Sequence, residues 1–273
     1  MLYQLSYTPM AKAERISMLR RRWQAAYRRA PQGAKADAVM HAPAPEIIPA
    51  ELLLRAYRSG IFPMADHRDD PDVYWVEPRE RGIIPLDGFR VSQSLRKQLR
   101  QNRFRVSCDE AFDAVIAECA QPREELAESW ISRRIETSYR ALHRSGHAHS
   151  IECWHDGELV GGLYGVAFAR VFCGESMFSR RTNASKIALA WLVAAMRRAG
   201  YALLDCQFMT DHLASMGAAA IPQAEYMDRL QAASGSPLCT LPNAFSGFYS
   251  EAGALGASSS PGKVIAHSLI QTS

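Results

Sequence analysis

The sequence lacks any apolar run long enough to cross a membrane, since its longest stretches, such as residues 187–196, are far shorter than a spanning helix needs. It also lacks a positively charged start followed by an apolar segment, so no secretion signal is evident. The six cysteines stand singly, with no C-x-x-C pair and no His/Cys spacing typical of a metal site. These absences predict a cytoplasmic protein with free, reduced cysteines, no membrane span and no metal site.

An excess of positive charge is also missing from most of the chain. The net charge of +4 comes from residues 1–45, which hold eight Lys/Arg against two acids, whereas the remaining residues carry 24 Lys/Arg against 26 acids. We expect residues 1–45 to be a flexible basic arm; a short amphipathic helix at 11–30 and an extension translated from an upstream start are the alternatives. A body that binds RNA must therefore use local basic patches.

The composition is that of a globular protein, with 48% hydrophobic and 22% charged residues over 273 positions. This length suffices for one large domain or two smaller ones. We expect a small α+β domain over 46–125 and a second domain over 126–232. The segment 233–273 is rich in Ser, Gly, Ala and Pro without sustained periodicity, so it is predicted to be a mostly disordered tail.

Capping and turn residues predict the elements within these domains. Ser92 is a candidate N-cap for a basic helix over 92–100, and Asp156-Gly157 is the turn signal of a hairpin formed by 149–154 and 159–178. A helix beginning at residue 50 should stop at Ser59-Gly60. Further strands are expected at 73–78, 82–84 and 202–208, and further helices at 109–119, 132–145, 183–199 and 224–232.

Three polar residues stand in apolar strand segments. Asp205 and Gln207 follow the apolar run 202–204, and Glu175 lies in the Gly-punctuated segment 161–179. Residues two apart in a strand share a face, so Asp205 and Gln207 should point the same way. Such side chains either face a pocket or form a buried, satisfied pair, and the residues alone leave both interpretations open.

Many ordered segments of the chain match one known family. They run from about Ile48 to about Leu230 and include LLLRAYRSGIFPM (52–64), YWVEPRERG (74–82), SQSLRK (92–97), CDEAFDAVIAECA (108–120), YRALHRSGHAHSIECW (139–154), GESMF (174–178), SRRTNASKIAL (179–189) and the D-x-Q pair. In these segments the chain resembles the leucyl/phenylalanyl-tRNA–protein transferase family. The resemblance implies an α+β fold in which a small N-terminal α+β domain precedes a GNAT-like acyltransferase domain, with a mixed sheet and packed helices.

The resemblance also implies a reaction. Members transfer Leu or Phe, and less readily Met, from aminoacyl-tRNA to acceptor proteins that begin with Arg or Lys, and so mark those proteins for degradation. This is aminolysis of an activated ester, which needs alignment, a proton acceptor and oxyanion stabilisation but no cofactor in principle. The implied partners are aminoacyl-tRNA and the acceptor protein, and the expected oligomeric state is a monomer.

The catalytic residues that the resemblance implies are Asp205, Gln207 and Glu175. In the family's proposal Asp205 polarises Gln207, whose amide oxygen receives the proton. An amide oxygen is a very poor base, so a shuttle through the terminal ribose hydroxyl of the tRNA is an equally good route. Glu175 would hold the acceptor's cation by a charge-assisted hydrogen bond; the alternative is an ion pair with Arg180 or Lys186.

The same resemblance implies substrate-binding residues. Gly174 and Ser176 flank Glu175 in the motif, and Trp75 and Trp130 match aromatic residues that stack on the terminal adenosine, although the residue after Trp75 is Val76 where relatives carry a second Trp. The aminoacyl pocket would be lined by Leu163, Phe172, Leu189, Leu192, Met196 and Leu204. By their spacing alone these six residues, and Trp75, fit an ordinary core equally well.

A basic cluster without a single acid covers residues 90–105. We interpret it as a patch that contacts tRNA phosphates, although a solvated helix face is the usual alternative. Its members are Arg90, Arg96, Lys97, Arg100, Arg103 and Arg105.

Two rival functions remain at this point. One is an aminoacyl-tRNA- or acyl-CoA-dependent acyltransferase with another acceptor; a coenzyme A site should show a Gly-rich loop entering a helix, and residues 179–184 contain no glycine. The other is a non-catalytic RNA-binding module, which would not need Glu175, Asp205 and Gln207 together.

Overall fold

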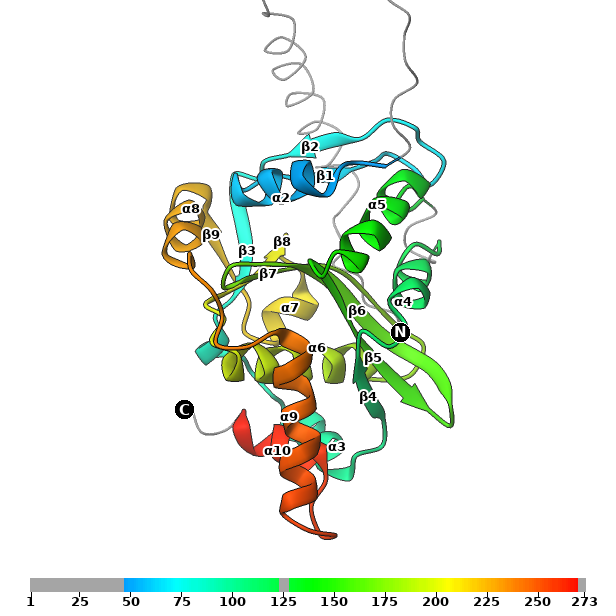
Figure 1. Cartoon of the computed structure of the whole chain (residues 1–273), viewed down its shortest axis with the longest axis vertical. Coiled ribbons are helices and arrows are strands. Elements are labelled where there is room, and N and C mark those ends of the chain that lie inside the picture. Colours follow the sequence, from blue (N-terminus) through cyan, green and yellow to red (C-terminus); the bar gives the residue numbers. More distant parts are fainter. Residues whose placement is uncertain (1–46, 123–127, 270–273) are drawn as a thin grey trace, which may run out of the picture.

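A seven-stranded mixed sheet forms the centre of the computed structural model, which describes residues 47–122 and 128–269 (Figure 1). The expected arm at 1–45 lies outside the described residues. Among the described residues, no helix is both long and apolar enough to span a membrane. The strand order is β4-β5-β6-β7-β8-β3-β9, and β1 and β2 form a separate two-stranded sheet.

Within the large sheet, β7 and β8 run parallel, whereas every other neighbouring pair is antiparallel. This arrangement places the two strands that carry the candidate catalytic residues side by side. The strands are β1 Phe62–Met64, β2 Tyr74–Val76, β3 Glu80–Ile84, β4 Arg105–Cys108, β5 Ala148–His155, β6 Glu158–Phe168, β7 Val171–Ser179, β8 Leu203–Gln207 and β9 Ala219–Pro222.

Helices cover both faces of the sheet and bury two apolar cores. One core, which we call the α6 core, lies between the sheet and α6 (Ala184–Arg198), α3 (Gln93–Gln101), α9 (Leu241–Ala254) and α10 (Pro261–Ser268). The opposite core, the α2–α5 core, is formed with α2 (Ala50–Arg58), α4 (Phe112–Cys119), α5 (Arg133–Arg144) and α8 (Gln223–Ala232). The short helices η1 (Leu86–Gly88) and α7 (Asp211–Ser215) complete the described elements.

The predicted fold class, α+β with a mixed sheet and packed helices, is confirmed, and several local signals act as expected. The Ser92 hydroxyl accepts a hydrogen bond from the Leu95 backbone N–H and so caps α3. Asp156 and Gly157 have positive φ values of 52° and 81° in the turn between β5 and β6. The predicted hairpin is longer than expected, because 159–178 contains two strands, β6 and β7, which meet at a second tight turn.

The prediction of a disordered tail over 233–273 is wrong for residues 241–268. Helix α9 is capped by the Thr240 hydroxyl, and its Phe248 is 1% exposed against Trp191 of α6. Helix α10 packs on α3 so closely that a Cβ at Gly262 would lie 2.1 Å from the Leu99 carbonyl oxygen. Burial of this apolar surface, and not local propensity, orders the segment.

The expected division near residue 125 does not separate two sheets. Strand β3, from the predicted N-terminal domain, pairs with β8 and β9, and β4 pairs with β5. The predicted boundary itself falls in 123–127, outside the described residues. What does stand apart is the β1–β2 hairpin, which lies with α2 above the sheet in Figure 1.

Candidate functional site

The three candidate catalytic residues lie where β7 and β8 diverge. The two strands pair through Val171–Leu203, Phe172–Leu204 and Cys173–Asp205, the last register pair between them. On β7, Gly174 pairs with Gly165 of β6 and Ser176 pairs with Tyr164, so Glu175 is the extra residue of a β-bulge. Bulges re-aim side chains, and this one turns Glu175 toward the α2–α5 core.

Strand β8 ends in a strained turn at Gln207. Its φ is +57°, and the Phe208 N–H donates to the Cys206 carbonyl at 2.6 Å, which closes a γ-turn. Such a turn is rare and strained for a residue other than glycine. Gly82 of β3 lies opposite, and a Cβ there would come within 2.9 Å of the Phe208 carbonyl carbon. The absence of a side chain at Gly82 therefore makes room for the turn.

Asp205 is fully buried, and its carboxylate accepts four hydrogen bonds. Arg81 Nε donates to Oδ1 at 2.8 Å and Arg81 Nη2 to Oδ2 at 2.6 Å. The Tyr226 hydroxyl donates to Oδ2 at 3.1 Å, and the Gln207 backbone N–H donates to Oδ1 at 2.9 Å. Four donors occupy the lone-pair positions of a carboxylate. Asp205 therefore contacts Gln207 through the backbone rather than through the side-chain amide that the family's proposal requires.

Arg81, the partner of Asp205, is 0% exposed. Besides the two bonds to Asp205, its Nη1 donates to the Gly60 carbonyl at 2.9 Å, and its guanidinium lies over the rings of Phe62 and Tyr226. Burial alone would lower the pKa of Arg81, but the charge of Asp205 and its hydrogen bonds, with smaller contributions from Tyr226 and Cys173, together outweigh burial and raise the pKa. Sequence reasoning did not identify Arg81, although a buried acid beside an apolar strand requires a partner.

Glu175 is 3% exposed and has a different environment. Its Oε1 accepts from the Gln207 side-chain Nε2 at 3.0 Å, and its Oε2 accepts from the Tyr139 hydroxyl at 3.2 Å; Tyr139 in turn shares a hydrogen bond with Tyr57. Burial, assisted by the nearby charge of Asp205, raises the pKa of Glu175 to about 8, although the two tyrosine hydroxyls oppose the shift. Without bound substrate, Glu175 is therefore mostly protonated at neutral pH.

The alternative partners proposed for Glu175 lie elsewhere. Arg180 pairs with Glu118 of α4 at 2.6 Å. Lys186 lies near His212, and burial together with this neighbouring charge lowers the pKa of His212 to about 4. No cation among the described residues forms an ion pair with Glu175. The buried carboxyl is thus bound by neutral donors only.

Two buried hydroxyls beside Glu175 have no hydrogen-bond partner among the described residues. They are Tyr164 Oη of β6 and Ser176 Oγ of β7, which occupy paired positions on the two strands. Gly174 has ordinary space around it, because a Cβ there would lie 3.6 Å from the Asp205 carbonyl oxygen. The region around Glu175 therefore has spare hydrogen-bonding capacity, as expected where a polar substrate group binds.

The two candidate adenosine-stacking tryptophans are half-buried on the same side as Glu175. Both pack against the α2–α5 core. Trp75 on β2 pairs with Pro63 of β1, and the Trp130 carbonyl accepts from the Ala65 N–H at 3.2 Å. The segment after β1 is thus attached directly to the segment that leads into α5.

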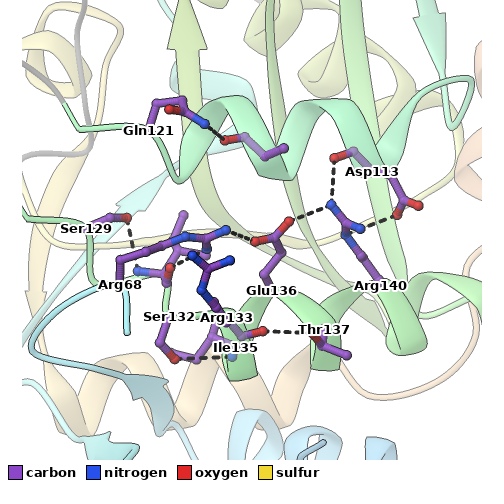
Figure 2. A network of polar contacts seen from close by, with 12 residues as sticks. Arg68, Asp113, Gln121, Ser129, Ser132, Arg133, Ile135, Glu136, Thr137 and Arg140 are labelled. Atoms are coloured by element: carbon purple, nitrogen blue, oxygen red, sulfur yellow. Dashed lines mark hydrogen bonds and ion pairs between the residues drawn. The ribbon is translucent and has the colours of Figure 1, made fainter. Parts of the chain in front are cut away.

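An ionic network centred on the buried Glu136 strengthens this attachment (Figure 2). The Glu136 carboxylate of α5 lies between Arg68 and Arg140, with Arg140 Nη2 at 2.5 Å. Arg68 also donates to the Ile131 carbonyl at 2.8 Å, and Arg133 binds Asp69 at 2.7 Å. The network fixes the β1–β2 connection on the start of α5, and thereby the two elements that carry the tryptophans.

Comparison with known proteins agrees with the motifs from which the site is built. Residues 83–231 match the family model described as leucyl/phenylalanyl-tRNA protein transferase, and residues 47–79 match the model of its N-terminal domain. The chain belongs to this family. Its members' name denotes an aminoacyltransferase, so the protein is an enzyme that acts with leucyl- or phenylalanyl-tRNA and protein acceptors.

Individual relatives agree. Leucyl/phenylalanyl-tRNA–protein transferases from Novosphingobium aromaticivorans and Rhizorhabdus wittichii are 65% and 58% identical over 189 and 188 residues, which cover 69% of this chain and 72% and 76% of theirs. The enzyme from Zymomonas mobilis is 56% identical over 190 residues, 70% of this chain and 71% of its own. Among solved structures, L-PGS from Bacillus licheniformis covers 60% of this chain and 55% of its own at 14% identity and a TM-score of 0.33, a likeness too weak to support an argument.

The six residues predicted to line the aminoacyl pocket lie on the other side of the sheet from Glu175. All belong to the α6 core and are at most 2% exposed. The structure brings them together, but as closely packed core residues, in keeping with the alternative that their spacing left open. They are Leu163, Phe172, Leu189, Leu192, Met196 and Leu204.

The segment 90–105, which carries the predicted phosphate-binding patch, lies around α3 on the α6 side of the sheet (Figure 1). Arg105 does not fit the prediction, because it forms a two-point ion pair with Glu110 at 2.5 and 2.8 Å and lies over the Trp154 ring. The remaining five side chains form no ion pair within the described residues, and α3 presents a shallow hollow lined by Arg96, Lys97 and Arg100. Patch and tryptophans therefore lie on opposite faces of the transferase.

Proposed function

We propose that this transferase moves Leu or Phe, and less readily Met, from aminoacyl-tRNA to acceptor proteins that begin with Arg or Lys, and that the new N-terminus marks them for degradation. The enzyme acts as a monomer in the cytoplasm. The observation that supports the acceptor choice is Glu175, a buried carboxyl bound only by neutral donors at the point where β7 and β8 diverge. A cationic acceptor group there would complete an ion pair.

The chemistry is an aminolysis. The acceptor's α-amino nitrogen attacks the ester carbonyl, an N–C bond forms, and the C–O bond to the ribose breaks. One amine proton ends on the released ribose oxygen. Because no group of the chain needs to form a covalent intermediate, alignment carries most of the task and can contribute on the order of 7–11 kcal/mol.

The proton can leave the attacking amine by two routes, which an experiment can distinguish. Gln207 Nε2 donates to Glu175, which leaves the amide oxygen of Gln207 free to accept from the attacking amine. The other route passes through the neighbouring hydroxyl of the terminal ribose. A donor tRNA that lacks the terminal 2′-hydroxyl distinguishes them: a near-normal rate excludes the ribose shuttle and favours Gln207, whereas a large loss supports the shuttle.

The acceptor proposal is tested with labelled Leu on charged tRNA and short peptides beginning with Arg, Lys or Ala. We expect transfer to the Arg and Lys peptides, and a loss of most of it in Glu175→Gln with aminoacyl-tRNA binding retained. Glu118→Gln, which removes a carboxylate paired with Arg180 on the surface, is the matched control and should transfer normally. Unchanged transfer in Glu175→Gln would remove Glu175 from the site.

For the donor, we propose that Trp75 and Trp130 stack on the terminal adenosine. Their half-buried rings on neighbouring, mutually attached segments support this role. Stacking contributes about 1–3 kcal/mol per base. The pocket for Leu or Phe would be formed by the six α6-core residues named above. Because they are closely packed across the sheet from Glu175, this role requires the side chain to enter between the diverging ends of β7 and β8 and these residues to move apart. Leu163→Met tests this through the ratio of Leu to Phe transfer.

We propose that the basic patch without Arg105 contacts tRNA phosphates. Replacing Lys97 and Arg100 by Ala should weaken tRNA binding and reduce the slope of log affinity against log salt by roughly one per lost contact. Arg105→Ala is the control, because its charge is already paired with Glu110. An unchanged slope in the Lys97/Arg100 variant places the tRNA elsewhere on the protein.

A further inference from the structure

Arg81 is a fully buried arginine that reaches four separate parts of the fold. Its guanidinium contacts Asp205 on β8, the Gly60 carbonyl after α2, the Phe62 ring on β1 and the Tyr226 ring on α8. We propose that Arg81 is a positioning residue of the transfer reaction: it fixes the Asp205 carboxylate, which in turn holds the turn that aims the Gln207 amide at Glu175. This inference rests on the catalytic roles proposed above for those residues.

The geometry restricts the Asp205 carboxylate to one orientation. Two parallel N–H bonds, at 2.8 and 2.6 Å, join the guanidinium fork to both carboxylate oxygens. The two rings hold the guanidinium from their faces, with its carbon 4.8 Å from the Phe62 centroid and 4.4 Å from the Tyr226 centroid. A lysine could supply the charge but neither the planar fork nor the stacking.

The orientation of Asp205 is transmitted to Gln207 through the backbone. Asp205 Oδ1 accepts both from Arg81 Nε and from the Gln207 N–H, at 2.8 and 2.9 Å. A residue other than glycine held at φ +57° costs about 1–3 kcal/mol and persists only where its surroundings impose it. If the carboxylate rotates, this bond weakens, the turn relaxes, and the Gln207 amide loses its 3.0 Å contact with Glu175.

Arg81 also connects the reacting centre to the proposed adenosine site. The Gly60 carbonyl and the Phe62 ring lie directly before and on β1, and β1 pairs with β2 through Pro63 and Trp75. The Arg81 side chain therefore contacts both the β1–β2 hairpin, which carries Trp75, and β8, which carries Asp205, and it fixes their relative position. Donor placement and acceptor placement are set from the same buried group.

The charge of Arg81 has an effect that is separable from its shape. It lowers the pKa of Glu175, whereas the charge of Asp205, with which it pairs, raises that pKa more strongly, so removal of Arg81 disturbs both contributions. The titratable groups that face Glu175 come from every element around it; they are Tyr57, Tyr139, Tyr164, Cys173 and Asp205. Two of them, Cys173 and Asp205, also interact with Arg81. A lysine keeps the charge without the fork, whereas a glutamine keeps neither.

The test compares Arg81→Lys and Arg81→Gln with Arg198→Lys. Arg198 pairs with Glu251 and lies over the Phe248 ring, so it is a matched control far from the site. We expect kcat to fall roughly 10²-fold in Arg81→Lys, as for a displaced catalytic group, with a smaller change in KM for aminoacyl-tRNA and normal kcat in Arg198→Lys. The midpoint of the rise of kcat with pH should shift in Arg81→Gln and stay near its wild-type value in Arg81→Lys.

Tyr226→Phe is a milder second variant, which keeps the proposal testable if the Arg81 variants do not fold. It removes the 3.1 Å hydroxyl bond to Asp205 but keeps the ring against the guanidinium. It should lower kcat by a smaller factor while urea stability stays close to that of the wild type. A folded Arg81→Lys or Tyr226→Phe enzyme with wild-type kcat would overturn the proposal. If the wild type does not use an Arg peptide, the acceptor proposal fails, and Arg81 is tested with whichever peptide the wild type accepts.

Discussion

The protonation of Glu175 makes the stability of the enzyme depend on pH in an unusual direction. The pKa of this buried carboxyl is raised from 4.5 to about 8. The folded state therefore binds the proton more tightly than the unfolded state does. Its contribution to stability is complete below about pH 4.5 and is lost as the pH rises through about 8.

The size of this effect follows from the shift. Each pH unit between the two pKa values changes the free energy of unfolding by about 1.4 kcal/mol. Between about pH 5 and pH 8 the wild type should lose roughly 3 kcal/mol through this one residue. Glu175 is 3% exposed, so solvent screening does not reduce the effect much. Glu175→Gln lacks the titration, so its stability relative to the wild type should rise by that amount over the same range.

Urea denaturation at several pH values measures this difference. Wild type and Glu175→Gln are compared at about pH 5 and about pH 8, with Glu118→Gln as a control that removes a paired surface carboxylate. We expect the first gap, the stability of Glu175→Gln minus that of the wild type, to increase from the lower to the higher pH, and the corresponding gap for Glu118→Gln to remain nearly constant. If the first gap is the same at both pH values, Glu175 does not stay protonated in the fold and the reasoning fails.

Three further predictions concern the catalytic pair, the turn at Gln207 and the packing of α9. Asp205→Asn and Gln207→Ala should each lower kcat by roughly 10²–10⁴-fold if proton handling is lost. Because the two residues act as one unit, kcat of the double variant should be only slightly lower than that of the slower single variant, as measured by steady-state kinetics. Gly82→Ala, whose Cβ would lie 2.9 Å from the Phe208 carbonyl carbon, should shift the γ-turn and lower the transfer rate at a cost of about 1–3 kcal/mol in urea stability. Phe248→Ala should destabilise the protein by about 3–5 kcal/mol, whereas no change in stability is expected if α9 were disordered.

Local signals in the sequence predict most elements but miss those that depend on tertiary contacts. Ser92 and the Asp156-Gly157 turn act as predicted. Helix α9 was missed because Gly247 and Gly253 weaken its propensity, and its order comes from packing on α6. Its start was nevertheless signalled by Thr240 with a proline in the first turn, a cap that α10 repeats with Ser260.

In the site too, features set by neighbouring residues are predictable from the sequence, whereas features set by contacts distant in the sequence are not. The alternation of a strand places Asp205 and Gln207 on one face, but it contains no sign of the turn at Gln207, which depends on the space at Gly82 across the sheet. The β-bulge at Glu175 is likewise a property of the pairing of β6 with β7. Arg81 is 124 residues away from Asp205 in the sequence, so only the requirement that a buried acid have a partner points to it.

The two buried carboxyl groups of the site differ in their partners, and this difference assigns them different roles in the proposed reaction. Asp205 has a fixed cation and four donors, which suits a group that holds other residues in place. Glu175 has neutral donors and a pKa of about 8, so it can exchange its proton for an incoming cation. Binding of an acceptor Arg at neutral pH should therefore release close to one proton, which calorimetry in buffers of different ionisation enthalpy detects. Release that persists in Glu175→Gln would assign the proton to another group, and with it the cation-binding role.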